Sequence, residues 1–171
     1  MNLFTDSSRI VITCNKRLSP CLQQEVTELG YDIENVFSTG VEMKGTLHDC
    51  IRLNLNLRCA SQVLFSLLEF KCKNAEKLYD KLLDYPWERI ISEDGFFTVT
   101  IHTENFTINN ELFVNVKIKD AIVDRFRREV GRRPDSGSSL EGVVIHLHWR
   151  ENNAEVFLDT SGETALDHVT H

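Results

Sequence analysis

Short β-branched runs alternate with amphipathic segments along the first 72 residues, and this alternation constrains the fold more than any other feature of the chain. The run RIVITC (9–14) predicts a strand. The next segment predicts a helix that starts at Leu18 or Ser19, carries Pro20 near its first position and ends at Gly30. The chain therefore opens with a strand followed by a helix.

The same alternation continues to residue 72. Residues 31–45 predict two short strands around a turn at 38–40, where Thr-Gly supplies the bend. A second helix is predicted from residues at helical spacing, and these are Leu47, Ile51, Leu55 and Arg58. The near-continuous apolar run VLFSLLEFKC (63–72) suits a buried strand. The order β-α-β-β-α-β is the ferredoxin-like pattern of two split βαβ units.

The second half of the chain has a different order. Asn74 is a suitable N-cap for a helix that Pro86 ends, and a short helical turn is expected at 87–91. A strand over 96–104 and a helix over 113–130 follow. Two further strands, VVIHLHWREN and NAEVFLDTSG, surround a turn at 151–153. This half reads α-α-β-α-β-β.

These elements predict the α+β class with two small domains. We expect an N-terminal ferredoxin-like domain at 1–72, a second domain at 73–163 and a tail at 164–171. A family profile for the second domain could begin nearer residue 43. The Gly/Ser/Pro-rich stretch within 131–142 is expected to be a loop, and there is no internal repeat.

The composition fits a globular protein in an aqueous compartment. A chain of 171 residues with 42% hydrophobic content can build a core. Its sequence has no run of eighteen apolar residues, and its first residues show neither a basic n-region nor an apolar h-region. We therefore expect a cytoplasmic protein that does not bind membranes.

The cysteines and histidines suggest no metal centre. Five cysteines lie within the first 72 residues without any CxxC pair, so we expect five buried free thiols rather than disulfides or a zinc knuckle. His146 and His148 share one face of a predicted strand, for which an exposed strand face is favoured over a metal site.

The sequence was searched for two kinds of site, a hydrolase triad and a nucleotide-binding motif. Ser136, Ser138 and Ser139 could be combined with His146 and Asp159 as a hydrolase triad, but no GxSxG motif accompanies them. Neither GxGxxG after a strand nor a P-loop is present. The sequence therefore indicates no catalytic residue, no metal ligand and no cofactor of its own for this chain.

Positive charge is concentrated in KIKDAIVDRFRREVGRRP (117–134). The formal net charge of the chain is −7, yet residues 113–134 hold seven Lys and Arg against three carboxylates, a local balance of +4 that leaves −11 for the rest. A basic patch of this kind can attract a polyanion even on an acidic protein. Helix C-terminal cations, worth a few tenths to about 1 kcal/mol each, account for only part of the excess.

The helical periodicity of this segment separates a core face from a basic face. Stepping by 100° per residue groups Ile118, Ile122, Val123, Phe126 and Val130 on one arc and turns most cations outward. Lys119 falls within the apolar arc, where its long side chain has to reach outward to solvent or a ligand. Arg132 and Arg133 follow Gly131, the expected end of the helix.

These motifs together resemble a known family. KIKDAIVDRFRREVGRRP, followed by a two-strand unit ending in LDTSGE (158–163), is similar to the THUMP domain of bacterial 23S rRNA guanine-N2 methyltransferases of the RlmL type. CNKRLSPCLQQEVTELG, GVEMKG and NLRCASQVLFSLLEF resemble earlier parts of that family in the same order. The resemblance extends from about residue 9 to residue 163.

The resemblance implies RNA as the partner, with 23S rRNA the first candidate. It implies that a set of cations faces RNA, namely Lys117, Lys119, Arg125, Arg127, Arg128, Arg132 and Arg133. In the family an Arg-Gly-Tyr-Arg segment leads into a catalytic domain that binds S-adenosylmethionine, whereas here TALDHVTH follows LDTSGE. The resemblance thus implies methylation by a domain outside this chain, in cis or in trans, and leaves open a fragment or a free-standing recognition module.

Two other functions remain open from the residues. A protein-interaction or regulatory domain agrees with the net charge of −7, the basic helix then recognising an acidic protein surface. A tRNA-modifying THUMP enzyme, such as a thiolase or deaminase subunit, is the other alternative. LRCAS (57–61) and KDAIVD (119–124) favour the rRNA methyltransferase branch by resemblance.

Overall fold

The structure is a computed structural model and describes residues 4–91, 96–103, 111–131, 135–136 and 143–161. The chain divides into two compact units, the first made of 1–67 with 158–161 and the second of 68–157 with 162–171. As domain boundaries, 1–72, 73–163 and 164–171 stay predictions.

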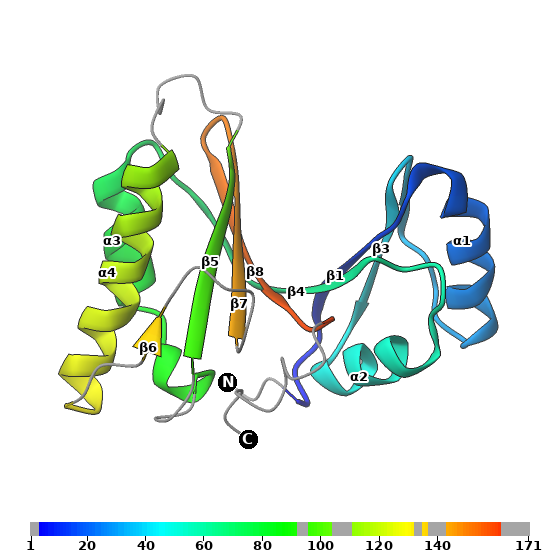
Figure 1. The fold of residues 1–171 in the computed structure, drawn as a ribbon, viewed down its shortest axis with the longest axis horizontal. Helices are drawn as coiled ribbons and strands as arrows, with labels where there is room; N and C mark the ends of the chain where they lie inside the picture. The colour runs from blue at the N-terminus through cyan, green and yellow to red at the C-terminus, as the bar shows by residue number, and fades with distance from the viewer. Residues whose placement is uncertain (1–3, 92–95, 104–110, 132–134, 137–142, 162–171) are drawn as a thin grey trace. The chain divides into compact units, whose positions relative to one another are not determined.

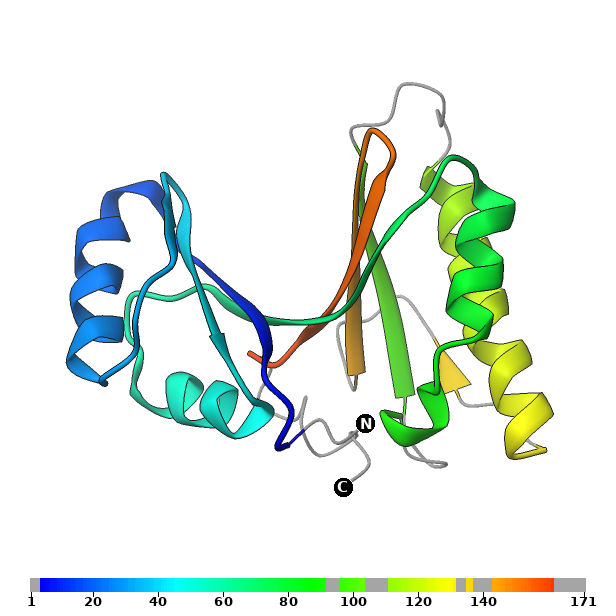
Figure 2. The same cartoon turned by 180° about the vertical axis from the view of Figure 1, so that it is seen from behind.

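The first unit follows the predicted ferredoxin-like order (Figure 1). Its elements are β1 (Ser8–Thr13), α1 (Ser19–Glu28), β2 (Asn35–Phe37), β3 (Gly40–Gly45), α2 (Leu47–Asn56) and β4 (Gln62–Lys71), with a short 3₁₀ helix at Lys16–Leu18. The strands lie in the order β2-β3-β1-β4, all antiparallel. In both views α1 and α2 lie on the same side of β1 and β3 (Figures 1 and 2).

Local signals set the boundaries of the helices in this unit. Pro20 lies in the first turn of α1, and Gly30 follows the helix with φ +94°, a left-handed conformation that suits glycine. Thr46 and Asp49 form a capping box at the start of α2, each side chain accepting a hydrogen bond from the other's backbone N–H. Ile10, Ile12, Val41 and Met43 are fully buried on the strands.

The face of α2 that packs on the sheet differs from the prediction. The buried residues are Leu47, Cys50 and Leu53, whereas Leu55 is 79% exposed and Arg58 lies beyond the helix. Two apolar stripes run along this helix and share Leu47, and packing selects the one that contains Cys50 and Leu53.

The second unit contains the other two helices. The order is α3 (Ala75–Leu83), a 3₁₀ helix at Trp87–Arg89, β5 (Phe96–Thr103), α4 (Glu111–Glu129), β6 (Asp135–Ser136), β7 (Val143–Arg150) and β8 (Asn153–Asp159). Both figures show α3 and α4 side by side on one side of β5 and β7. Asn74 caps α3 as expected, accepting a hydrogen bond from the Lys77 N–H at 2.9 Å.

The strands of this unit lie in the order β4-β8-β7-β5-β6. β5 pairs in parallel with β7, Phe97 opposite Val143 and Thr103 opposite Trp149, and with β6. The loop expected within 131–142 was wrong at 135–136, because these two residues form β6 beside residues 96–97 of β5. Residues 132–134 and 137–142 of that stretch, and the tail at 164–171, lie outside the described residues.

The prediction of five free thiols was wrong for two cysteines. Cys14, Cys50 and Cys72 are buried and free, but Cys21 and Cys59 form a disulfide. The reason is topological: β1 pairs with β4, with Thr13 opposite Gln62, and this brings the start of α1 close to the loop that precedes β4. None of the described helices has the length and apolarity that crossing a bilayer would require.

Candidate RNA interface

Helix α4 presents one face to the core and the other to solvent. From residue 113 onward, where side-chain burial is described, its buried residues are Val114, Ile118, Ala121, Ile122, Val123 and Phe126. The predicted apolar arc is thereby confirmed for Ile118, Ile122, Val123 and Phe126, while Val130 is half-buried. Asn115 fastens the first half of the helix to β5, because its amide donates to the Val99 carbonyl at 2.9 Å.

Lys117 lies in an aromatic setting near the start of α4. Its ammonium is 5.6 Å from the centre of the Phe113 ring and 5.8 Å from the centre of the Tyr79 ring. Both distances are within the range of a cation–π contact. Phe113 is 46% exposed, so the charge and the ring share one accessible patch.

Lys119 lies on the border between the two faces. It is half-exposed, and the next residue on that side of the helix one turn later, Val123, is buried. The ammonium can therefore reach solvent while the methylene stem covers apolar surface.

Arg125 is already engaged within the protein. Its guanidinium donates two hydrogen bonds to Glu88, from Nε to Oε2 at 3.1 Å and from an Nη atom to Oε1 at 2.9 Å. It also donates to the Leu83 carbonyl at 3.5 Å and lies 3.9 Å from Glu129. Only 15% of the Arg125 side chain and 19% of the Glu88 side chain are exposed. This forked pair joins α4 to the 3₁₀ helix that follows α3.

The pair shifts both ionisation equilibria toward the charged forms. Burial acts to raise the pKa of Glu88, but the hydrogen bond and charge of Arg125 outweigh it, and the net pKa lies below the usual value. The pKa of Arg125 is raised, chiefly by its hydrogen bond to Glu88. We therefore assign Arg125 first to packing.

Arg127 and Arg128 are the exposed cations of the last turn of α4. Arg128 keeps half of its side chain exposed, 49%, although its Nε lies 3.1 Å from the carboxylate of Glu129. An exposed pair of this kind contributes little to stability, so Arg128 can exchange its partner at low cost. Arg132 and Arg133 lie outside the described residues.

Asp124 is used internally in the same way as Arg125. The Tyr79 hydroxyl of α3 donates a hydrogen bond to its carboxylate. This hydrogen bond, followed by burial, raises the pKa of Tyr79 to about 12. Since Asp124 binds Tyr79, one of the three carboxylates counted against the basic segment is partly screened.

The aromatic residues of this surface were not identified from the sequence. Phe113 precedes Lys117 by one turn, a spacing that could have indicated the contact. Tyr79 is remote in the sequence and reaches α4 only because α3 and α4 pack together. The described surface thus combines exposed cations with accessible aromatic carbon.

The exposed strand face expected for the histidines was wrong. His146 is 5% exposed and His148 is half-buried. A third imidazole, that of His102, lies opposite His148 on β5, with ring centres 5.1 Å apart. The parallel pairing of β5 with β7 brings the three together, which no local spacing indicated.

The proposed serine triad gains no support. Ser138 and Ser139 lie outside the described residues. The carboxylate of Asp159 accepts hydrogen bonds from Gln62 and from the Ser161 N–H. Among the described residues, α4 therefore offers charge and surface for binding, with no assembled nucleophile and base.

Comparison with known proteins identifies both parts of the chain. Residues 72–159 match the THUMP domain family, and residues 9–64 match the RlmL ferredoxin-like domain. The chain therefore belongs to the THUMP domain family, and its first part is a ferredoxin-like domain of the RlmL kind. THUMP domains bind RNA.

Relatives come from rRNA-modifying enzymes. The chain is 34% identical over 159 residues to a ribosomal RNA large subunit methyltransferase K/L of Pseudomonas aeruginosa, covering 93% of this chain and 22% of that protein. The corresponding protein of Psychromonas ingrahamii is 35% identical over 147 residues, covering 86% and 20%. The chain thus spans about a fifth of the length of these relatives.

The fold recurs in solved methylase structures. A protein of Listeria monocytogenes, described as a predicted N6-adenine-specific DNA methylase, superposes with a TM-score of 0.76 at 28% identity. The match covers 92% of this chain and 41% of that one.

Proposed function

We propose that this chain binds ribosomal RNA in the cytoplasm and positions it for methylation by a catalytic domain in cis or in trans. Cations of α4 make the contact, with the exposed Arg127 and Arg128 at its centre and the half-buried Lys117 and Lys119 extending it. Arg132 and Arg133 belong to this proposal through their sequence position. The relatives' activity on large-subunit rRNA suggests the class of RNA.

One observation carries the proposal: in a THUMP domain of a net acidic chain, the arginines of the last helical turn remain exposed. Arg125, three residues away from Arg128, shows the alternative, since its fork is buried against Glu88. Cations kept in solvent on a rigid helix neutralise phosphates without losing an internal partner. Phosphate contacts position the RNA, and its shape supplies selectivity.

The salt dependence of RNA affinity tests this proposal. A large-subunit rRNA fragment and an unrelated hairpin of equal length serve as probes. If four to six phosphates are neutralised, the logarithm of affinity falls with the logarithm of salt at a slope of about −3 to −5, as expected for single-stranded to duplex sites. A flat dependence, or no binding to either RNA, contradicts the proposal and favours the protein-interaction alternative.

A charge reversal locates the surface. Arg127→Glu combined with Arg128→Glu should weaken binding roughly 10- to 100-fold and make the salt slope less steep by about 2. Lys16→Glu with Arg17→Glu, two exposed cations of the first unit, makes the same change in net charge and is the matched control. Equal losses in both variants would show a general charge effect and would remove α4 as the proposed surface.

A further inference from the structure

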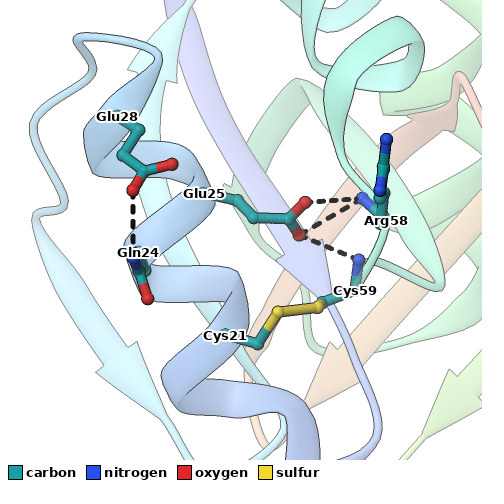
Figure 3. The surroundings of a disulfide bond; sticks show 6 residues. All are labelled: Cys21, Gln24, Glu25, Glu28, Arg58 and Cys59. Carbon is teal, nitrogen blue, oxygen red and sulfur yellow. Dashed lines mark hydrogen bonds between the residues drawn. A yellow bond between two sulfur atoms is a disulfide. The ribbon is translucent and has the colours of Figure 1, made fainter.

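Three residues of the first unit, Cys21, Glu25 and Cys59, form a cluster of possible metal ligands. Cys21 and Glu25 are one turn apart on α1, and Cys59 comes from the loop between α2 and β4 (Figure 3). The two cysteines form a disulfide with a Cα–Cα distance of 6.3 Å. The helical spacing of four residues places Cys21 and Glu25 on the same face of α1, toward that loop.

The Glu25 carboxylate is held in a fixed orientation beside the sulfurs. Its Oε1 accepts the Cys59 N–H at 2.9 Å, and its Oε2 accepts the Arg58 N–H at 2.9 Å (Figure 3). Two backbone donors thus orient it, as second-shell hydrogen bonds orient carboxylate ligands in metal sites. The Arg58 N–H also lies 3.2 Å from Oε1, so Oε1 accepts from both donors and Oε2 from one. Since a carboxylate can accept about four hydrogen bonds, Oε2 retains a lone pair.

The distances within the cluster suit a small thiophilic cation. The two Sγ atoms and a Glu25 carboxylate oxygen all lie within 4.8 Å of one another. In a tetrahedral zinc site, with Zn–S near 2.3 Å and Zn–O near 2.0 Å, neighbouring ligand atoms are about 3.5 to 3.8 Å apart. With Cα atoms 6.3 Å apart, the two sulfurs can reach that separation by side-chain rotation once the S–S bond is broken.

We propose that Cys21, Glu25 and Cys59 form a redox-gated site for a thiophilic divalent cation, with Zn²⁺ as the probe. When the thiols are reduced, two thiolates and one carboxylate bind the metal, and water takes the fourth position. When they are oxidised, the disulfide consumes both sulfur ligands. The site is independent of the proposed RNA contact.

The gating step is a two-electron reduction. With a phosphine as the reductant, two electrons pass from phosphorus to the disulfide and the S–S bond breaks. A water molecule gives its two protons to the sulfurs, which become thiols, and its oxygen to phosphorus, so that the phosphine becomes its oxide. Zinc binding then displaces the two thiol protons, so that affinity rises with pH.

The other cysteines do not compete for this role. Cys14, Cys50 and Cys72 are buried and separate. Burial raises the pKa of all three thiols, that of Cys50 to about 12. Cys21, by contrast, is exposed, so a cation can enter from solvent.

Calorimetry with Zn²⁺ on the full 171-residue chain tests the proposal, and Co²⁺ absorbance reports thiolate ligation. After phosphine reduction, one equivalent should bind and a thiolate-to-cobalt charge-transfer band should appear. The oxidised protein should show neither. Binding by the oxidised protein that equals binding by the reduced protein, or no binding after reduction, overturns the proposal.

Three variants identify the ligands. Cys59→Ser should weaken the cobalt band, which only Cys21 can then supply, and weaken zinc binding at least tenfold. Glu25→Gln should weaken binding roughly 10-fold while retaining the full band. Glu28→Gln is the matched control, since Glu28 lies on the same helix and pairs with Gln24 at 3.0 Å (Figure 3). Unchanged affinity in the first two variants, or an equal loss in Glu28→Gln, contradicts the assignment; circular dichroism confirms that each variant is folded.

Discussion

Arg125 and Arg128 lie on the same helix, but their side chains have different surroundings. Arg125 is oriented toward Glu88 and is mostly buried, whereas Arg128 is half-exposed beside Glu129. A guanidinium fork that is already matched to a carboxylate cannot bind a phosphate without leaving Glu88 unpaired. Residue type alone therefore does not show which cations of α4 are free of an internal carboxylate partner of this kind.

The Arg125–Glu88 pair should contribute measurably to stability. We expect Arg125→Ala to lower the free energy of unfolding by about 1 to 2 kcal/mol, because it removes a forked hydrogen bond and leaves a mostly buried carboxylate. Arg127→Ala, an exposed control, should change it by less than about 0.5 kcal/mol. Equal effects of the two substitutions in urea titrations would contradict this role.

The same pair predicts a dependence on pH. The pKa of Glu88 is lower in the folded protein than in the unfolded chain, so its contribution is complete above the unfolded value of about 4.3. The contribution is lost as pH falls through the folded pKa. The difference in unfolding free energy between wild type and Arg125→Ala should therefore shrink below pH 4.3, and a difference that grows there would refute the assignment.

Tyr79 makes the complementary prediction at alkaline pH. Its pKa is raised to about 12 by the hydrogen bond to Asp124, against about 10 in an unfolded chain. The resulting stabilisation is complete below pH 10 and is lost as pH rises toward 12. The pKa values of Tyr31 and Tyr85 are raised as well, so the quantity to measure is the difference in phenolate absorbance between wild type and Tyr79→Phe. This difference should show one tyrosine titrating near pH 12, and that step should persist in Tyr31→Phe, the control.

At the scale of elements, local sequence signals predicted where helices begin and end better than which face of a helix is buried. Pro20, Gly30 and Asn74 set helix ends that the structure confirms, since each acts on its immediate neighbours. The buried face of α2 could not be predicted, because two apolar stripes were available and only packing on the sheet selects one. The strand β6 has two residues and no apolar run, so no local sequence signal predicts it.

The candidate site divides in the same way. The amphipathic pattern of α4 predicted its core face. Glu88 and Tyr79, which contact Arg125, Lys117 and Asp124, come from elements 37 to 45 residues away, and only the tertiary fold brings them to α4.

Gly40 lies where β3 pairs with β1, at a position that has no room for a side chain. A Cβ atom on Gly40 would lie 2.2 Å from the Ile12 carbonyl oxygen, a backbone atom that cannot rotate away. Gly40→Ala should therefore lower the unfolding free energy by about 2 to 3 kcal/mol, as overpacking does. Gly45→Ala meets the Asp49 carboxylate first, at 2.7 Å, and should cost less because a side chain can move. A larger loss at Gly45 would contradict the argument.

At the scale of the whole molecule, the disulfide closes a loop between residues 38 positions apart. In a chain-entropy treatment, a loop of this length contributes up to about 4 kcal/mol, and engineered bonds often deliver less. Reduction should lower the unfolding free energy by about 2 to 4 kcal/mol, whereas reduced and untreated Cys59→Ser should be equally stable. If reduction destabilises Cys59→Ser as well, the loss has a cause other than the Cys21–Cys59 bond.

The short segment Leu158–Ser161 has a consequence for the order in which the protein is made. It belongs to the first unit, where Thr160 donates its N–H to the Val63 carbonyl and accepts the Asn54 amide. The ribosome adds Leu158 at a point 87 positions after Lys71, the last residue of β4 (158 − 71). The first unit therefore remains incomplete until residues 68–157 of the second have been synthesised. Because each unit is made of two separate stretches of the chain, a single crossover in a gene could not transfer either unit whole.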